Sequence, residues 1–238
     1  MKKIGILFLM SLTFIFSGCL DDDGYSLSDM WVGFGILQET DDDPAEYRII
    51  MDDDDEVLIP VASNYGSYHY ADNSHFKDGD RVLVNFTVLD DNGSDDEEPT
   101  EYFVKINSIR KILMKGILDI TEENEDSIGN DPVIVNDVWM TDSLLNFKIK
   151  YWGYNETHFI NLVKQPGELT SNDQPIELEL RHNSNDDEES IPYSAYVSFK
   201  LSALEIAGLD SVQFKVTYTD YDGDELDYDG VYHYGGND

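Results

Sequence analysis

The chain has 238 residues, of which 41% are hydrophobic and 12% aromatic, so it can bury a core large enough for one or two domains. Its 50 acidic and 15 basic side chains give a formal charge of −35, which argues against nucleic acid as a partner because such a surface repels phosphate backbones. The single cysteine excludes an intramolecular disulfide, and the many tyrosines and phenylalanines favour a β-rich protein.

Residues 1–18 are predicted to form a lipoprotein signal peptide. A short basic start precedes the apolar stretch Ile4–Phe16, which is too short to cross a bilayer and suits the apolar region of a signal peptide. The small residues Ser17 and Gly18 then precede Cys19, a pattern that resembles the lipobox, although a phenylalanine stands where the lipobox usually has leucine. The alternative is an ordinary secretory signal with an incidental cysteine.

Lipidation of Cys19 would make this residue the membrane anchor of the protein. Each buried acyl CH₂ contributes about 0.8 kcal/mol, so two or three palmitate-type chains hold a protein stably. Residues 19–29 are predicted to form a solvated acidic tether. Within it, Asp21, Asp22 and Asp23 resemble the surface-export signals of lipoproteins in Bacteroides-type bacteria, and the two roles can hold together. We therefore expect the protein on the surface of the outer membrane, with its periplasmic leaflet as the alternative.

Residues 30–113 are predicted to form a small barrel. In Arg81–Leu89 the apolar side chains recur at every second position, as expected for a half-buried strand. Five antiparallel strands in about eighty residues favour a closed barrel of the OB type. The expected strands are Trp31–Gln38, Glu46–Met51, Val57–Val61, Arg81–Leu89 and Tyr102–Ile109.

A stretch rich in tyrosine follows the third expected strand. Tyr65, Tyr68 and Tyr70 alternate there with polar residues and could form a stacking platform for a ligand on the barrel. The alternative is that these rings extend the third strand and pack on the barrel.

Residues 114–234 are predicted to form a β-sandwich, because six or seven short strands are separated by turn-rich segments. Thr121–Pro132 reads as a boundary or long loop, and Ser202–Ala207 as a short helical turn. The three tryptophans, Trp31, Trp139 and Trp152, are expected in the core. The expected strands are Val133–Met140, Leu144–Tyr151, Thr157–Lys164, Ile176–Arg181, Ala195–Lys200 and Ser211–Thr219.

Near the C-terminus, Asp220, Asp222 and Asp224 alternate beside a glycine in a pattern somewhat like a calcium loop. The spacing of an EF-hand is incomplete, so the alternative is the acidic end of a hairpin, and we expect at most weak Ca²⁺ binding and no cofactor. The five histidines form no zinc-type pair, and His158 is expected to be a packed ring within a strand. No known catalytic motif is present.

Four ordered blocks carry a family resemblance: "DGDRVLVNFTVLDD", "YFVKINSIRKIL", "DSIGNDPVIVNDVWM" and "HFINLV". With the lipobox, they resemble the NigD-like lipoproteins of Bacteroides-type bacteria. This resemblance implies an OB-like domain followed by a C-terminal β-sandwich. The founding member of the family lies in a bacteriocin-linked gene cluster, which suggests an immunity or accessory role, and the family provides no catalytic residues to transfer.

The sequence therefore predicts an all-β lipoprotein that acts as a non-enzymatic binding module, with a glycan or a protein as ligand. An immunity-like protein that captures a toxin is the second hypothesis, and a glycan hydrolase is the third. With so many acidic residues, no catalytic pair of carboxylates can be singled out.

Overall fold

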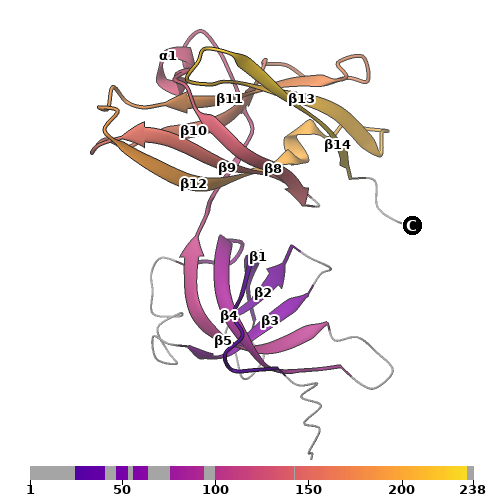
Figure 1. Ribbon diagram of the computed structural model, residues 1–238. Helices are drawn as coiled ribbons and strands as arrows, with labels where there is room; N and C mark the ends of the chain where they lie inside the picture. The colour runs from indigo at the N-terminus through magenta and orange to yellow at the C-terminus, as the bar shows by residue number, and fades with distance from the viewer. Residues whose placement is uncertain are drawn as a thin grey trace, which may run out of the picture.

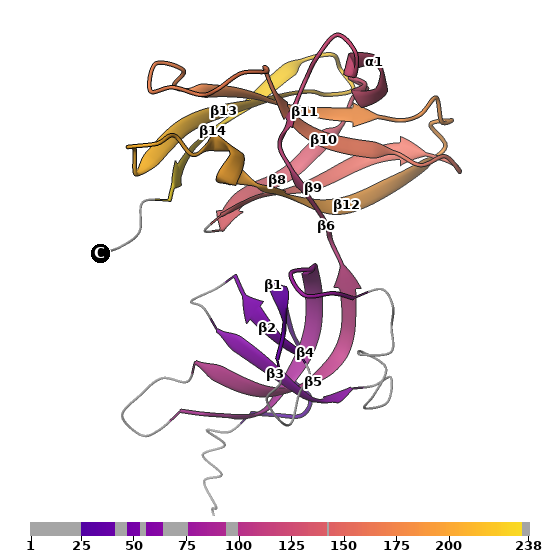
Figure 2. The ribbon, with the colours of Figure 1, turned by 180° about the vertical axis from the view of Figure 1, so that it is seen from behind.

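The computed structural model describes residues 25–40, 47–52, 56–63, 76–93, 100–141 and 143–234. It confirms the expected all-β organisation, with a barrel built from the first half of the chain and a sandwich built from the second (Figure 1). The chain passes once from the barrel to the sandwich, directly after the last barrel strand (Figures 1 and 2).

The barrel contains five strands in the closed order β1-β2-β3-β5-β4. They are β1 (Trp31–Glu39), β2 (Tyr47–Met51), β3 (Val57–Ser63), β4 (Arg81–Asp91) and β5 (Glu101–Lys111). The prediction of five antiparallel strands is wrong for one pair, since β3 and β5 run parallel. A closed ring with an odd number of strands cannot alternate direction all the way round, so one parallel pair is unavoidable.

The apolar positions of β4 fill the centre of the barrel, as their alternation predicts. Val82 and Val84 are fully buried, and Phe86 and Val88 nearly so. They pack against apolar residues from the other four strands, which completes a core separate from that of the sandwich. The other fully buried or nearly buried members are Leu37, Ile49, Met51, Leu58, Val104 and Ile106.

The sandwich consists of two packed sheets (Figures 1 and 2). One has the order β6-β12-β9-β8 and faces the barrel at one end, and the other has the order β14-β13-β11-β10-β7. The strands of the first are β6 (Leu113–Gly116), β8 (Ile134–Thr141), β9 (Leu144–Gly153) and β12 (Ile191–Lys200). Those of the second are β7 (Leu118–Asp119), β10 (Phe159–Lys164), β11 (Ile176–Asn183), β13 (Ser211–Thr219) and β14 (Glu225–His233).

The structure adds elements that the sequence did not indicate. The uncertain stretch Arg110–Ile120 divides between the end of β5, β6 and β7, and the short helix α1 (Glu125–Ile128) lies within the expected loop. The expected helical turn is a 3-10 helix at Leu201–Leu204. Along the parts of the chain that the structure describes, no helix has both the length and the apolar character needed to cross a membrane.

Candidate binding groove between the domains

A groove of about 540 Å³ opens where the barrel meets the sandwich. Its volume lies in the range of small-molecule and oligosaccharide sites, which typically occupy about 300–1,000 Å³. Both domains contribute to its walls, so the groove depends on how they are joined. Its lining residues are Val32, Gly33, Phe34 and Asp52 from the barrel, and Asp137, Trp139, Met140, Thr141, Lys148 and Tyr196 from the sandwich.

Three aromatic rings form the apolar part of the groove. Phe34 on β1 lies 5.4 Å from Trp139 on β8 and 5.1 Å from Tyr196 on β12, measured between ring centroids. Trp139 and Tyr196 lie 6.3 Å apart and nearly perpendicular. These edge-on and tilted contacts are the favourable geometries for aromatic pairs, and they hold the rings together while leaving each only half buried.

The expectation that all three tryptophans belong to the core is wrong. Trp31 is 54% exposed at the start of β1, and Trp139 is a wall of the groove. Trp152 is half-buried at the end of β9, where its ring packs edge-on against Tyr221 at 4.8 Å. Strand context alone did not reveal which face of the sheet each ring occupies.

A buried arginine contacts two lining residues of the groove from behind, Asp52 and Phe34. Arg81 is completely buried at the start of β4 and forms an ion pair with Asp52, which uses both carboxylate oxygens. Its Nη2 also donates a hydrogen bond of 3.2 Å to the side-chain oxygen of Asn146 on β9, in the other domain. Ser198 donates to the same oxygen at 2.6 Å, and the ring of Phe34 lies over the guanidinium at 5.4 Å. This chain of contacts links the two domains directly beneath the rings.

The polar groups of the groove can serve a ligand rich in hydroxyls. Lys148 carries donors, the exposed Asp137 carries acceptors, and Thr141 offers a hydroxyl. Because Asp52 is occupied by Arg81, Asp137 is the one carboxylate among the lining residues that is not already in an ion pair with a described residue. The groove thus combines ring faces with separate donors and acceptors, which is the chemistry of a binding site.

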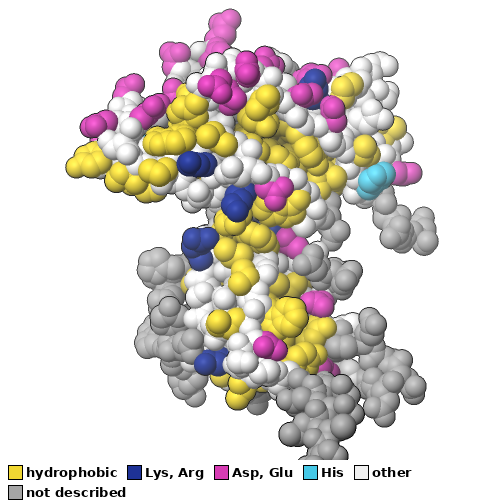
Figure 3. Space-filling model, viewed as in Figure 1, with side chains coloured by type: hydrophobic (Ala, Val, Ile, Leu, Met, Phe, Trp, Pro, Cys, Tyr) yellow, Lys and Arg dark blue, Asp and Glu magenta, His cyan; other side chains and the backbone are white. Residues whose placement is uncertain are grey.

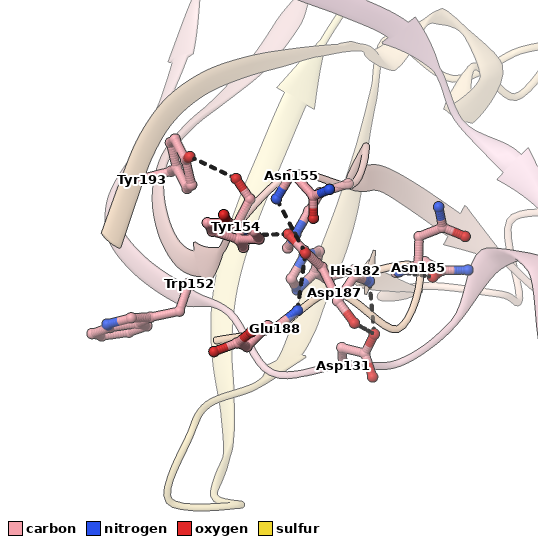
Figure 4. A network of polar contacts seen from close by, with 12 residues as sticks. Asp131, Trp152, Tyr154, Asn155, His182, Asn185, Asp187, Glu188 and Tyr193 are labelled. Atoms are coloured by element: carbon pink, nitrogen blue, oxygen red, sulfur yellow. Dashed lines mark hydrogen bonds and ion pairs between the residues drawn. The ribbon is translucent and has the colours of Figure 1, made fainter. Parts of the chain in front are cut away.

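A second polar cluster lies inside the sandwich, around the segments that follow β9 and β11 (Figure 4). His158 Nε2 lies 3.1 Å from Asp187 Oδ2, and His182 Nδ1 lies 2.9 Å from the carbonyl oxygen of Pro132. The side chains of His158 and Asp187 are only 4% and 2% exposed, so a substrate cannot reach them. His158 is a packed ring, as the sequence predicted, but it lies directly before β10 and not within a strand.

Hydrogen bonds explain the ionisation state of this cluster. Burial raises the pKa of Asp187, but hydrogen bonds from the backbone N–H groups of Tyr154 and Asn155 and from His158 outweigh it and hold this pKa well below its usual range. Burial lowers the pKa of His182. The Asp187 carboxylate thereby ties its loop to the segment after β9, and the cluster has a structural role.

Of the residues singled out in the sequence, several lie outside the described residues: Cys19, Asp21, Asp22, Asp23, Tyr65, Tyr68 and Tyr70. Asp220, Asp222 and Asp224 lie in the turn that joins β13 to β14. There Asp220 Oδ1 accepts hydrogen bonds from the backbone N–H groups of Asp222 at 2.9 Å and Asp224 at 3.0 Å. This is the geometry of an acidic hairpin end. Within the described ranges, no three His, Cys, Asp or Glu side chains are placed to hold a metal ion.

Sequence reasoning missed the groove because its residues come from strands far apart in the chain. Phe34, Trp139 and Tyr196 are separated by more than fifty residues at each step and share no motif. Only the docking of one domain on the other brings them together.

The fold and groove define a two-domain all-β protein in which an OB-like barrel carries a C-terminal sandwich. The family model of the NigD-like C-terminal β-sandwich domain matches residues 116–231. The chain belongs to the NigD-like family.

Solved structures share the whole two-domain arrangement. A candidate toxin-related protein from Parabacteroides distasonis is 30% identical, with a TM-score of 0.66, and the match covers 86% of this chain and 94% of that one. A protein of unknown function from Bacteroides vulgatus is 24% identical, with a TM-score of 0.68 and coverage of 87% and 93%. A NigD-like immunity protein from Bacteroides caccae is 20% identical, with a TM-score of 0.61 and coverage of 86% and 93%. No curated protein matches the chain.

Proposed function

We propose that this NigD-like protein is a lipid-anchored, non-enzymatic binding module that takes a glycan in the groove between its domains. The observation that carries the proposal is the cluster of Phe34, Trp139 and Tyr196 beside Lys148 and Asp137. Sugars present apolar ring faces that pack on aromatic side chains and hydroxyls that bond to charged groups. A concave site with both features supports a glycan over a flat protein partner.

The absence of an enzymatic role is part of the proposal and is supported by the chemistry of the groove. Hydrolysis of a glycosidic bond ordinarily requires two carboxyl groups on either side of the bond. Of the two carboxylates in the lining, Asp52 has both oxygens engaged by the buried Arg81. Asp137 alone would have to act as acid and base, which leaves binding as the better supported activity.

Membrane anchoring through Cys19 supports placement at the cell surface. The apolar segment, the small residues before Cys19 and the acidic triplet Asp21–Asp23 provide the sequence basis. A glycan-binding module held there would meet extracellular polysaccharides, while the periplasmic leaflet is the alternative location.

A glycan array probed with the purified full chain tests the function. Trp139→Ala and Tyr196→Ala should each lower the signal on the bound glycans about tenfold or more, because stacked rings contribute strongly to contact energy. Tyr154→Ala is the control, since Tyr154 is 57% exposed but is not among the residues that line the groove. Equal losses for Tyr154→Ala, or an array without any bound glycan, would exclude the proposal. Urea denaturation of each variant separates loss of binding from loss of folding.

An immunity role is the second candidate, because the Bacteroides caccae relative is named as an immunity protein. Expression of the chain in toxin-sensitive cells provides its test. Protection that survives Trp139→Ala would favour toxin capture by another surface over glycan binding in the groove.

A further inference from the structure

The outer face of β9 carries a row of cationic and aromatic side chains that continues from the groove. Lys148, Lys150 and Trp152 occupy alternate positions of this strand and therefore point to the same side. On the neighbouring β12 they face Tyr196, Ser194 and Pro192, in that order. Figure 3 shows dark blue side chains among yellow ones near the junction of sandwich and barrel, with a few magenta side chains beside them and more over the upper part of the sandwich.

Both lysines are held by aromatic rings. Lys148 Nζ lies 5.8 Å from the ring centroid of Tyr196, and Lys150 Nζ lies 4.5 Å from that of Trp152. Trp152 is itself fixed, because its backbone N–H donates a hydrogen bond of 3.1 Å to the hydroxyl of Tyr221. A cation–π contact positions an ammonium group without neutralising it, so these lysines keep their charge and their N–H donors.

Neither lysine forms an ion pair with any described residue, although acids outnumber bases by 50 to 15. On the other sheet, by contrast, Lys164 pairs with Asp119 and Lys215 with Asp227. Asp137 lies opposite Lys148 in the strand register but does not contact it as an ion pair. Acids farther away are screened, since the Debye length is about 8 Å at physiological ionic strength. The face thus carries two lysines without an ion pair to a described residue, and Asp137 is the cross-strand neighbour of Lys148.

We propose that this face binds an acidic polysaccharide whose carboxylates pair with Lys148 and Lys150 while one sugar unit occupies the groove. The inference rests on the proposed function and names its ligand class. Alternate residues of a strand lie about 7 Å apart, so the two ammonium groups form a short row along which a linear polymer can lie. Ser194, exposed and directly opposite Lys150 on β12, adds a hydroxyl for the sugar units.

At their outward positions, β9 and β12 carry none of the large exposed apolar side chains that a protein partner needs. Interface centres are rich in large exposed apolar side chains and poor in lysine. Here the outward positions of β9 and β12 hold lysines, a serine, an exposed proline and half-buried rings. The exposed Ile191 and Tyr193 occupy the alternating positions of β12 and point to the other side of the sheet. The chemistry therefore favours a polysaccharide over an acidic protein.

The test uses oligogalacturonate and its methyl ester as probes, with the purified full chain in isothermal titration calorimetry. The two probes share a backbone and differ in charge. We expect binding to the free acid and little to the ester, and the double variant Lys148→Gln/Lys150→Gln should weaken binding about a hundredfold, because each charge-assisted hydrogen bond supports about tenfold. The double variant Lys148→Arg/Lys150→Arg keeps both positive charges and should retain binding. It also tests whether this face of the sheet tolerates substitution without unfolding.

The matched control is Lys164→Gln/Lys215→Gln, which removes the same charge from the opposite sheet and should leave affinity within about twofold. Equal binding of acid and ester would overturn the inference while leaving glycan binding by the groove intact. An equal loss in the control variant, comparable binding of poly-glutamate, or no binding of oligogalacturonate would each overturn it as well.

Discussion

The Nδ1 atom of His158 lies 2.8 Å from the Nε2 atom of His182, inside the sandwich. The outer nitrogens of the pair face groups that only accept hydrogen bonds: the Asp187 carboxylate and the carbonyl oxygen of Pro132. Both outer nitrogens must therefore carry hydrogen, and one more proton must lie between the rings. Three protons on four nitrogens give the pair one positive charge, which balances Asp187. Burial lowers the pKa of His182, which favours the neutral form of that ring.

This arrangement predicts a loss of stability in mild acid. The pKa of His182 is lower in the folded protein than its ordinary value of 6.5. As the pH falls, this ring therefore takes up a proton in the unfolded chain before it does so in the folded protein. The contribution of neutral His182 to the free energy of unfolding is complete above about pH 6.5. It declines as the pH falls further, at a rate of at most about 1.4 kcal/mol per pH unit. A second proton on His182 would set two N–H groups against each other. Urea denaturation between pH 7.5 and 5.5 measures the slope.

The variant His182→Gln should flatten this slope, while His233→Gln, on the exposed end of β14, should leave it unchanged. The ionisation of Asp187 does not contribute to this slope. Its pKa is depressed, so its contribution persists until the pH falls far below this window. A slope that survives in His182→Gln would show that another group is responsible.

Gly35 predicts a steric limit in the barrel wall. A Cβ atom at this position would lie 2.6 Å from both Ile49 Cγ2 and the backbone oxygen of Ile50 on the neighbouring strand. Since the backbone oxygen cannot move without breaking the sheet, Gly35→Ala should destabilise the barrel by about 1–3 kcal/mol. Gly116→Ala is the control, because a Cβ there meets nothing within 4 Å. Thermal unfolding followed by circular dichroism distinguishes the two, and equal melting temperatures would contradict the prediction.

Much of the fold was predictable because the local pattern of most strands is strong. Alternation in β4 correctly identified its buried side chains. The last strand, β14, was missed although Leu226, Tyr228 and Tyr232 alternate there, because the intervening acids and Gly230 resemble a loop. Gly230 is required by packing: a Cβ would lie 2.3 Å from the ring of Phe214 on β13, and that contact is invisible from sequence.

The groove and the cationic row show where sequence reasoning ends. The alternation of residues in β9 reveals that Lys148 and Lys150 lie on one face of the sheet. It does not reveal that neither lysine forms an ion pair with a described acid. Likewise, nothing near Arg81 in the sequence indicates that it reaches Asn146 in the other domain. Such contacts depend on how the domains dock, and no local pattern encodes that.

Arg81 should be the most sensitive single position for coupling of the domains. Arg81→Met leaves the Asp52 side chain, which is only 12% exposed, without its ion-pair partner. This change should lower the free energy of unfolding by about 3–5 kcal/mol. Replacing both residues, as Arg81→Met/Asp52→Leu, should cost less than the single change because no buried charge is left unpaired. Lys111→Met, which breaks the 2.7 Å pair with Asp80 at a lysine that is 48% exposed, should cost less than about 1 kcal/mol. Urea denaturation followed by tryptophan fluorescence measures these free energies. In Arg81→Met the single unfolding transition should also separate into two, one for each domain.

Lipidation predicts that Cys19→Ala releases the protein from membranes. The acyl chains supply the anchoring energy, at about 0.8 kcal/mol for each buried CH₂, and the thiol that carries them would be absent. Fractionation of cells that express the variant should move the protein to the soluble fraction. Replacing Asp21, Asp22 and Asp23 together by alanine is the matched variant, because it removes the acidic triplet but keeps the thiol. That variant should remain in the membrane fraction yet resist protease added to intact cells, since export to the surface is lost. A Cys19→Ala protein that still sediments with membranes would show that a different feature holds it there.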